Sequence, residues 1–194
     1  LGSIARQLAA PGRIESLRLT TFGTGSDQGA NAIARAIQRG YLRGIVEGVT
    51  DVNAPGKLKA LGVEVQTVRS SAEADYKELI LVEAVLAGGK TVSVAGTVIG
   101  KAQSPRIVSV NGRTLEFIPE GMLLLIENQD QPGIIGALGT LLAQERVNIA
   151  NMALSRSGGS NALAVYQLDT APGAAALAEI LRNPAIVSAK LIDA

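Results

Sequence analysis

The chain has 194 residues, enough for one large domain or two small ones with a buried core. Its 18 Lys and Arg residues nearly balance 17 Asp and Glu residues, and aromatic residues make up only 3%, so neither charge nor stacking surface favours a nucleic-acid partner. The absence of cysteine excludes disulfides and thiolate sites, and the absence of histidine removes the commonest general base and transition-metal ligand. We therefore expect neither a metal centre nor catalytic residues.

The chain carries no sign of a membrane or export segment. No apolar run reaches the roughly 18 residues of a membrane span, and no basic-then-apolar signal peptide opens the sequence. We expect a soluble, cytoplasmic protein with no membrane partner. Leu1 stands in a segment that is already patterned as a helix, so we also expect the chain to be a fragment of a longer protein.

Residues 1–119 are predicted to form an α+β domain with a largely antiparallel sheet. A helix to about residue 9 ends at Pro11-Gly12, and a strand covers residues 14–22. The glycine-rich residues 23–29 lack the Gly-Lys-Ser/Thr ending of a phosphate-binding loop, so we favour a flexible loop that leads into a helix. That helix carries apolar residues at helical spacing: Ile33, Ile37, Tyr41 and Ile45.

The rest of this region is mainly patterned as strands. A short helix is expected between a cap at Asn53 and an end at Gly62. Strands are expected over residues 63–68, 79–86, 91–98, 106–110 and 114–118. Gly88-Gly89 and Asn111-Gly112 are typical of tight hairpin turns. Pro119-Glu120-Gly121 is a plausible domain boundary.

Residues 120–194 repeat a simple order: strand, helix, strand, strand, helix, strand. The first strand contains the apolar run 123–126 and ends in the Asn-x-Asp of Asn128 and Asp130. The other strands are expected over residues 147–154, 162–168 and 186–192, with Gly158-Gly159 joining the middle pair. The two helices follow Pro132-Gly133 and Pro172-Gly173, and their apolar stripes are Ile134, Ile135, Leu138, Leu141 and Leu142 in one, and Leu177, Ile180 and Leu181 in the other. This βαββαβ pattern predicts a ferredoxin-like domain with helices on one face of the sheet.

The turn from Asn128 to Gly133 is the most distinctive candidate site. The first N–H groups of a helix have no internal partner and favour an anion, and Pro132 suits a first helical position. Asp130 can receive an ammonium group, so one turn offers both halves of a zwitterion a partner. We interpret it as an amino-acid binding site, although Asn and Asp are also common in plain turns and caps.

The second region resembles an ACT domain, the small amino-acid-sensing module of metabolic enzymes. The residues that carry the resemblance are Asn128, Asp130, Pro132, Gly133, Val147-Asn148-Ile149, Arg156 and the strand that ends at Asp169. The resemblance implies that Asn128, Asp130 and Asn148 contact L-serine, with Pro132 and Gly133 shaping the turn. It also implies that Asn148 comes from a neighbouring subunit, because ACT domains in the family pair side by side into one continuous sheet.

The first region resembles the intervening domain of the longer type of D-3-phosphoglycerate dehydrogenase. The segments that carry this resemblance are Val52-Asn53-Ala54-Pro55, Gly62-Val63, Val94-Ala95-Gly96-Thr97 and Pro105-Arg106-Ile107-Val108. The family implies an anion site here, to which Arg106, Arg113 and Lys101 correspond. Ile118 and Gln167 depart from it, since they stand about where a relative with a well-formed site would carry arginines.

Together the two resemblances imply the C-terminal regulatory half of that enzyme in serine biosynthesis. The fragment is expected to be non-catalytic and to hold no cofactor, while NAD belongs to the missing N-terminal catalytic domains. Its expected partners are L-serine and further copies of itself, through the ACT domains. Two alternatives stay open: a chain like the β-subunit of iron–sulfur L-serine dehydratase, and an oligomerisation module that senses nothing. The absence of histidine disfavours the dehydratase alternative.

Overall fold

A computed structural model of the chain describes residues 1–23, 27–156 and 160–194. The chain folds as two compact units, Leu1–Gly112 and Arg113–Ala194. The architecture is α+β with two mostly antiparallel sheets, as the sequence predicts. The domain boundary expected after residue 119 stays a prediction, because the division into compact units does not define where a domain begins.

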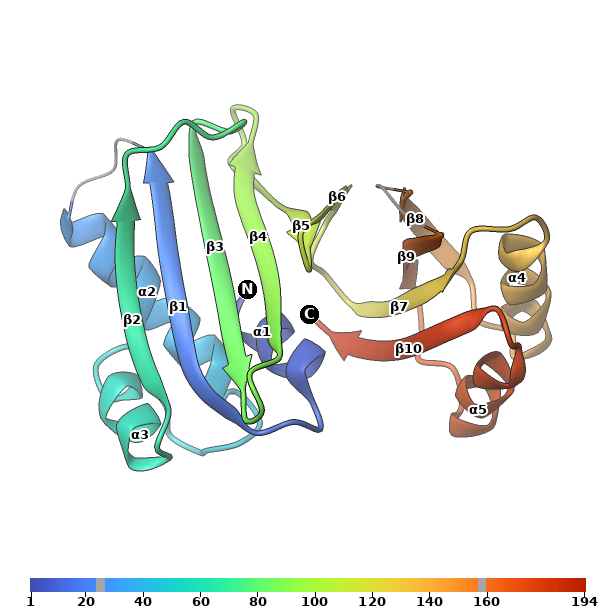
Figure 1. The fold of residues 1–194 in the computed structure, drawn as a ribbon, viewed down its shortest axis with the longest axis horizontal. Helices are drawn as coiled ribbons and strands as arrows, with labels where there is room; N and C mark the ends of the chain where they lie inside the picture. Colours follow the sequence, from blue (N-terminus) through green and yellow to red (C-terminus); the bar gives the residue numbers. More distant parts are fainter. Residues whose placement is uncertain (24–26, 157–159) are drawn as a thin grey trace. The chain divides into compact units, whose positions relative to one another are not determined.

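The first unit contains three helices that lie on one face of its sheet (Figure 1). The helices are α1 (Gly2–Ala9), α2 (Asp27–Leu42) and α3 (Ala54–Ala60). The strands are β1 (Ile14–Gly23), β2 (Glu64–Ser70), β3 (Glu78–Leu86), β4 (Thr91–Ile99) and β5 (Ser104–Val110). These strands lie in the order β2-β1-β3-β4-β5; β1 and β2 run parallel, and the pairs β1–β3, β3–β4 and β4–β5 are antiparallel.

Alternation along β1 explains why the helices cover a single face. Leu17 and Leu19 are almost fully buried, while Arg18 between them is exposed, as the period of two in a strand requires. Helix α1 lies close to α2 because Gly2 has no side chain. A Cβ on Gly2 would stand 2.0 Å from the carbonyl oxygen of Ile37, so a larger residue would push the two helices apart.

One sequence expectation for this unit needs correction, one is confirmed, and one lies outside the described residues. Helix α2 ends at Leu42, so Ile45 falls beyond it and is exposed, and Ile33 is also exposed. Asn53 stands at the N-cap of α3, as the sequence predicts, and its side chain accepts from the backbone N–H of Thr50 at 2.8 Å. Residues 24–26 of the expected glycine-rich loop are not described, and α2 already begins at Asp27.

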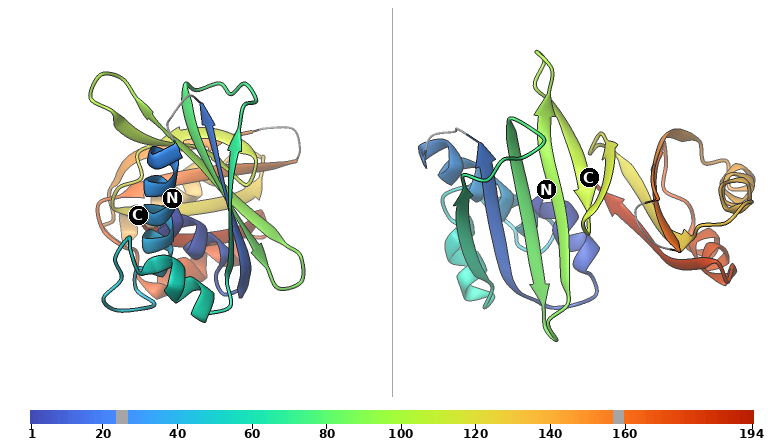
Figure 2. Two further views of the ribbon diagram at one scale, coloured as in Figure 1. Left: turned by 90° about the vertical axis from the view of Figure 1, so that its left-hand side faces the viewer. Right: turned by 45° about the horizontal axis from the view of Figure 1, so that its top comes forward.

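The second unit is a ferredoxin-like βαββαβ domain preceded by β6 (Arg113–Phe117). Its elements are β7 (Met122–Gln129), α4 (Ile134–Gln144), β8 (Ile149–Ser155), β9 (Asn161–Leu168), α5 (Ala174–Arg182) and β10 (Ile186–Asp193). The sheet order is β10-β7-β9-β8 with every neighbouring pair antiparallel. Figure 2 shows α4 and α5 together on one face of this sheet.

The core of this unit lies between its helices and its sheet. Leu124 and Ile126 of β7 pack with Tyr166 of β9 and with Leu138 and Ile180 of the two helices. Alternate residues on the other face are also buried, among them Leu123, Leu125 and Val165. Leu181, which the pattern placed in the α5 stripe, is 51% exposed and lies outside this core.

Tight turns carry the local geometry that glycine and asparagine favour. Asn111 and Gly112 have φ values of 50° and 73°, which matches the left-handed pair of a type I′ hairpin turn. The expected turn at Gly158-Gly159 lies outside the described residues.

Candidate functional site at the start of helix α4

Asn128 lies within strand β7, near its end, as the sequence pattern predicts. Even-numbered β7 residues point to the helix face, where Leu124 and Ile126 join the core, so Asn128 points to the same side. Its side chain is only 5% exposed, and its Nδ2 donates to the carbonyl oxygen of Gln129 at 2.6 Å. The amide is therefore held in place by its own strand.

Helix α4 starts two residues later than the sequence pattern predicts. Gly133 is the N-cap with φ of 93°, a left-handed conformation that cannot continue into a right-handed helix, so Ile134 is the first helical residue. The prediction of Pro132 as a first helical residue is therefore wrong, and Pro132 lies in the preceding turn. Gly133 offers no side chain as a cap, and the first helical bond runs from the N–H of Ala137 to the carbonyl of Gly133.

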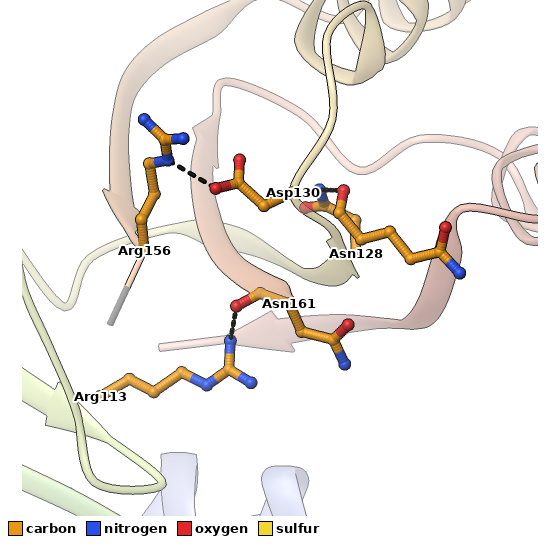
Figure 3. A network of polar contacts seen from close by, with 6 residues as sticks. Arg113, Asn128, Asp130, Arg156 and Asn161 are labelled. Atoms are coloured by element: carbon orange, nitrogen blue, oxygen red, sulfur yellow. Dashed lines mark hydrogen bonds and ion pairs between the residues drawn. The ribbon is translucent and has the colours of Figure 1, made fainter. Parts of the chain in front are cut away.

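Asp130 follows β7 and faces a basic side chain. Its backbone N–H donates to the carbonyl oxygen of Ser160 at 2.7 Å, which fixes the bend against the start of β9. Its Oδ2 lies 2.7 Å from Nε of Arg156, the residue directly after β8 (Figure 3). The side chains are 31% and 67% exposed for Asp130 and Arg156, so the ion pair is open to solvent.

Asn148 lies at the far end of the sheet from Asp130 within the same unit. The pairing places Ile149 opposite Leu168, and Leu168 opposite Met122 at the beginning of β7. The six residue steps from Met122 to Asn128 span about 20 Å at the usual strand rise. Asn148 instead donates from Nδ2 to Oδ2 of Asp169 at 2.9 Å. One chain alone therefore does not bring Asn148 to the turn after β7.

A second polar network lies beside the turn in the same unit. Arg113 donates from Nη2 to Oε1 of Glu127 at 2.8 Å and from Nη1 to the carbonyl oxygen of Asn161 at 3.1 Å. Asn161 pairs with Gln129, so this network ties β6 to the strand ends that carry the turn (Figure 3). The carboxylate of Glu127 is therefore a partner of Arg113. The sequence pattern did not predict this ion pair.

Contacts of Arg106 and Gln167 and the exposure of Lys101 describe the rest of the predicted anion site. Arg106 donates from Nη1 to Oγ of Ser104 at 2.6 Å and to the carbonyl oxygen of Pro105 at 2.9 Å. Lys101 is exposed in the turn before β5. Gln167 donates to the carbonyl oxygen of Glu120 at 3.1 Å. The anion site at Arg106, Lys101 and Arg113 stays a prediction.

Clusters of metal-ligating side chains and long apolar helices are both absent from the described part of the chain. Residues 1–23, 27–156 and 160–194 contain no group of three or more acidic side chains that could hold a metal ion. None of the helices described there is long and apolar enough to span a membrane.

Two models of known protein families match the chain. The family model described as the D-3-phosphoglycerate dehydrogenase intervening domain matches residues 1–111, more than half of the sequence. The chain belongs to this family. The model of the ACT domain matches residues 122–184, which covers the turn at Asp130 and helix α4. Both resemblances drawn from the sequence are thereby confirmed.

Individual relatives carry the same enzyme name. The chain is 38% identical over 122 residues to D-3-phosphoglycerate dehydrogenase of Mycobacterium leprae, which covers 62% of this chain and 23% of the relative. It is 36% identical over 146 residues to the protein of that name from Bacillus subtilis, covering 75% of this chain and 27% of the relative. It is 29% identical over 135 residues to the protein of that name from Archaeoglobus fulgidus, covering 68% of this chain and 25% of the relative. The chain thus matches about a quarter of the length of these relatives.

Proposed function

We propose that the chain is the regulatory part of a D-3-phosphoglycerate dehydrogenase and that its ACT domain binds L-serine as a feedback signal. The observation that carries this proposal is the turn after β7, where an acidic side chain and the uncapped start of α4 lie within four residues of chain. An ammonium group suits Asp130, and a carboxylate suits the free N–H groups at the helix start. The chain's own contribution is binding, and NAD and the chemistry belong to catalytic domains elsewhere in the parent enzyme.

The edge strand β8 supports pairing between two ACT domains. It ends the sheet order, and its residues Asn151, Met152 and Leu154 are exposed. Gly136 and Gly139 on α4 have open space around them, which leaves room for a close approach by a second helix. An exposed edge with apolar side chains is a template for pairing with another strand.

Antiparallel pairing of two β8 strands would complete the ligand site. In that arrangement the start of one β8 lies opposite the end of the other. The partner subunit's Asn148 would then stand near Arg156, and therefore near Asp130. The site residues Asn128, Asp130, Pro132, Gly133 and Asn148 thus belong to two chains, which fits the distance between Asn148 and Asp130 within one chain.

Ligand binding between subunits provides a means of regulation. A ligand that contacts both chains stabilises the paired arrangement over others, and linkage transmits this free energy to the rest of the enzyme. Serine is the end product of the pathway that the enzyme name implies, so control by serine at this interface is feedback control.

The test is a thermal melt of the purified chain with L-serine. We expect millimolar L-serine to raise the melting temperature and the Asp130→Ala variant to lose this shift. Asp75→Ala is the matched control, because Asp75 is an exposed acid in the first unit, and it should respond like the wild type. An unmoved melting curve for the wild type would instead favour an oligomerisation module that senses no amino acid.

A further inference from the structure

The ion pair between Asp130 and Arg156 uses only part of the arginine. Nε of Arg156 contacts Oδ2 of Asp130 at 2.7 Å, and this is the contact that defines the pair. Figure 3 shows the contact with Asp130 made through Nε, with no dashed line from either Nη atom. No partner for these Nη atoms is found among residues 1–23, 27–156 and 160–194. The open edge of the guanidinium is a fork of N–H donors beside an acidic group.

We propose that Arg156 binds the carboxylate of the amino-acid ligand and makes the site selective for zwitterions. This inference rests on the proposed function, and it adds a residue and a selection rule to that site. The ligand ammonium contacts Asp130, while the ligand carboxylate binds the free edge of Arg156 in addition to the N–H groups at the start of α4. Guanidinium groups hold carboxylates through paired N–H donors, which an ammonium group from lysine cannot reproduce.

Charge balance explains the selectivity. Asp130 and Arg156 neutralise each other before the ligand arrives, and a zwitterion leaves that balance unchanged. A ligand with an amine but no carboxylate competes with Arg156 for Asp130 and adds an uncompensated positive charge. A ligand with a carboxylate but no amine competes with Asp130 for Arg156 in the same way. Because the pair is exposed to solvent, it opens at little cost when a matching ligand arrives.

The position of Arg156 agrees with the proposed pairing of ACT domains. Arg156 directly follows β8, the strand that ends the sheet, so its side chain lies at the edge where the second domain would approach. The partner subunit's Asn148 would then reach the same ligand from the other side. Arg156 is thus a ligand-binding residue at the interface, and its ion pair in the free chain keeps it in place.

The experiment is calorimetric titration of the chain with three ligands. L-serine carries both charges, L-serinamide has the amine without the carboxylate, and 3-hydroxypropionate has the carboxylate without the amine. We expect the wild type to prefer L-serine to both. Arg156→Gln should weaken L-serine binding by about tenfold and leave L-serinamide within about twofold, so that the preference collapses. Arg156→Lys should restore only part of the affinity, because it keeps the charge and loses the fork.

The matched control is Arg182→Gln. Arg182 forms an ion pair with Glu179 in the same unit at 2.5 Å, and the two side chains are 75% and 53% exposed. The substitution therefore removes a comparable surface ion pair that lies away from the turn. It should bind L-serine like the wild type. Unchanged L-serine affinity in Arg156→Gln, or an equal loss for L-serine and L-serinamide, would overturn the inference while leaving serine sensing intact. If the wild type binds no L-serine, the proposed function fails and this inference fails with it.

Discussion

Replacing Tyr166 by Phe removes a single buried oxygen from the core of the ACT domain. Tyr166 is 1% exposed, lies on β9 beside β7, and belongs to the core cluster that includes Leu124 and Ile126. Its hydroxyl is buried and has no hydrogen-bond partner among the described residues. The ring itself fills the core, so the change leaves the packing of the aromatic side chain intact.

The expected effect is stabilisation. A buried polar group without a partner costs about 1–3 kcal/mol, whereas the small void left by one oxygen costs less. We therefore expect Tyr166→Phe to raise the free energy of unfolding by about 1 kcal/mol. For a domain of this size, that corresponds to an increase of roughly 4–8 °C in the melting temperature.

The same substitution changes the dependence of stability on pH. Burial raises the pKa of the Tyr166 phenol above its ordinary value of about 10. Below about pH 10 the phenol is protonated in both the folded and the unfolded state, and its contribution to stability is fully present. As the pH rises further, the unfolded state ionises first, so stability falls until the pH reaches the pKa of the folded state. The phenylalanine variant should lose less stability above about pH 10. Tyr41 should still contribute its own loss of stability at alkaline pH in the variant, because burial raises its pKa too, an effect partly opposed by Arg6.

Urea unfolding at neutral pH and at alkaline pH measures both effects. Tyr76→Phe is the control, because Tyr76 is only partly buried and should change the unfolding free energy by less than about 0.5 kcal/mol. A loss of stability in Tyr166→Phe at neutral pH would refute the reasoning, since it would mean that the hydroxyl has a partner in solution. An unchanged alkaline loss would refute the assignment of the raised pKa to this phenol.

Three further substitutions test other parts of the second unit. Arg113→Met should lower the unfolding free energy by about 1–2 kcal/mol, because the carboxylate of Glu127 loses its cation, and a much smaller effect in a Glu127→Gln background would confirm the pairing in urea melts. Arg146→Gly should stabilise by about 0.5–1 kcal/mol, because Arg146 has a φ of 57°; a lower melting temperature would contradict this. Leu154→Glu should weaken pairing through β8 by about tenfold or more in sedimentation equilibrium, and an unchanged association constant would exclude β8 as the interface.

The fold was predictable because local patterns and long-range packing agree. Alternation at Leu17, Arg18 and Leu19 predicts a strand with one buried face, and the structure places both leucines under the helices. Asn111-Gly112 predicts a hairpin through its preference for left-handed backbone. The strand–helix order of the second region similarly leaves the ferredoxin-like domain as the natural solution, since each helix returns the chain to the same sheet.

Errors arose where the tertiary structure decides an element's end. Helix α2 stops at Leu42 although the apolar spacing continues to Ile45, because periodicity does not encode where helical hydrogen bonds cease. Pro132 carries the signature of a helix start, yet the left-handed Gly133 sets the true beginning at Ile134. The ends of these helices depend on the backbone conformation of the turns that connect them to the strands.

The candidate site was predictable only in part. The stretch from Asn128 to Gly133 stands out in sequence because its residues are neighbours. The ion pairs of Asp130 with Arg156 and of Glu127 with Arg113 join residues far apart in the chain, and they depend on the register of β7 and β9. No spacing rule connects these partners before the sheet is known.

The most direct test of serine sensing is a crystal structure of the chain grown with excess L-serine. The account predicts two ACT domains joined along β8, with the ligand ammonium on Asp130, its carboxylate on Arg156, and the partner subunit's Asn148 closing the site. A turn that holds no ligand while Asp130 and Arg156 remain paired, or a ligand bound elsewhere on the domain, would contradict it.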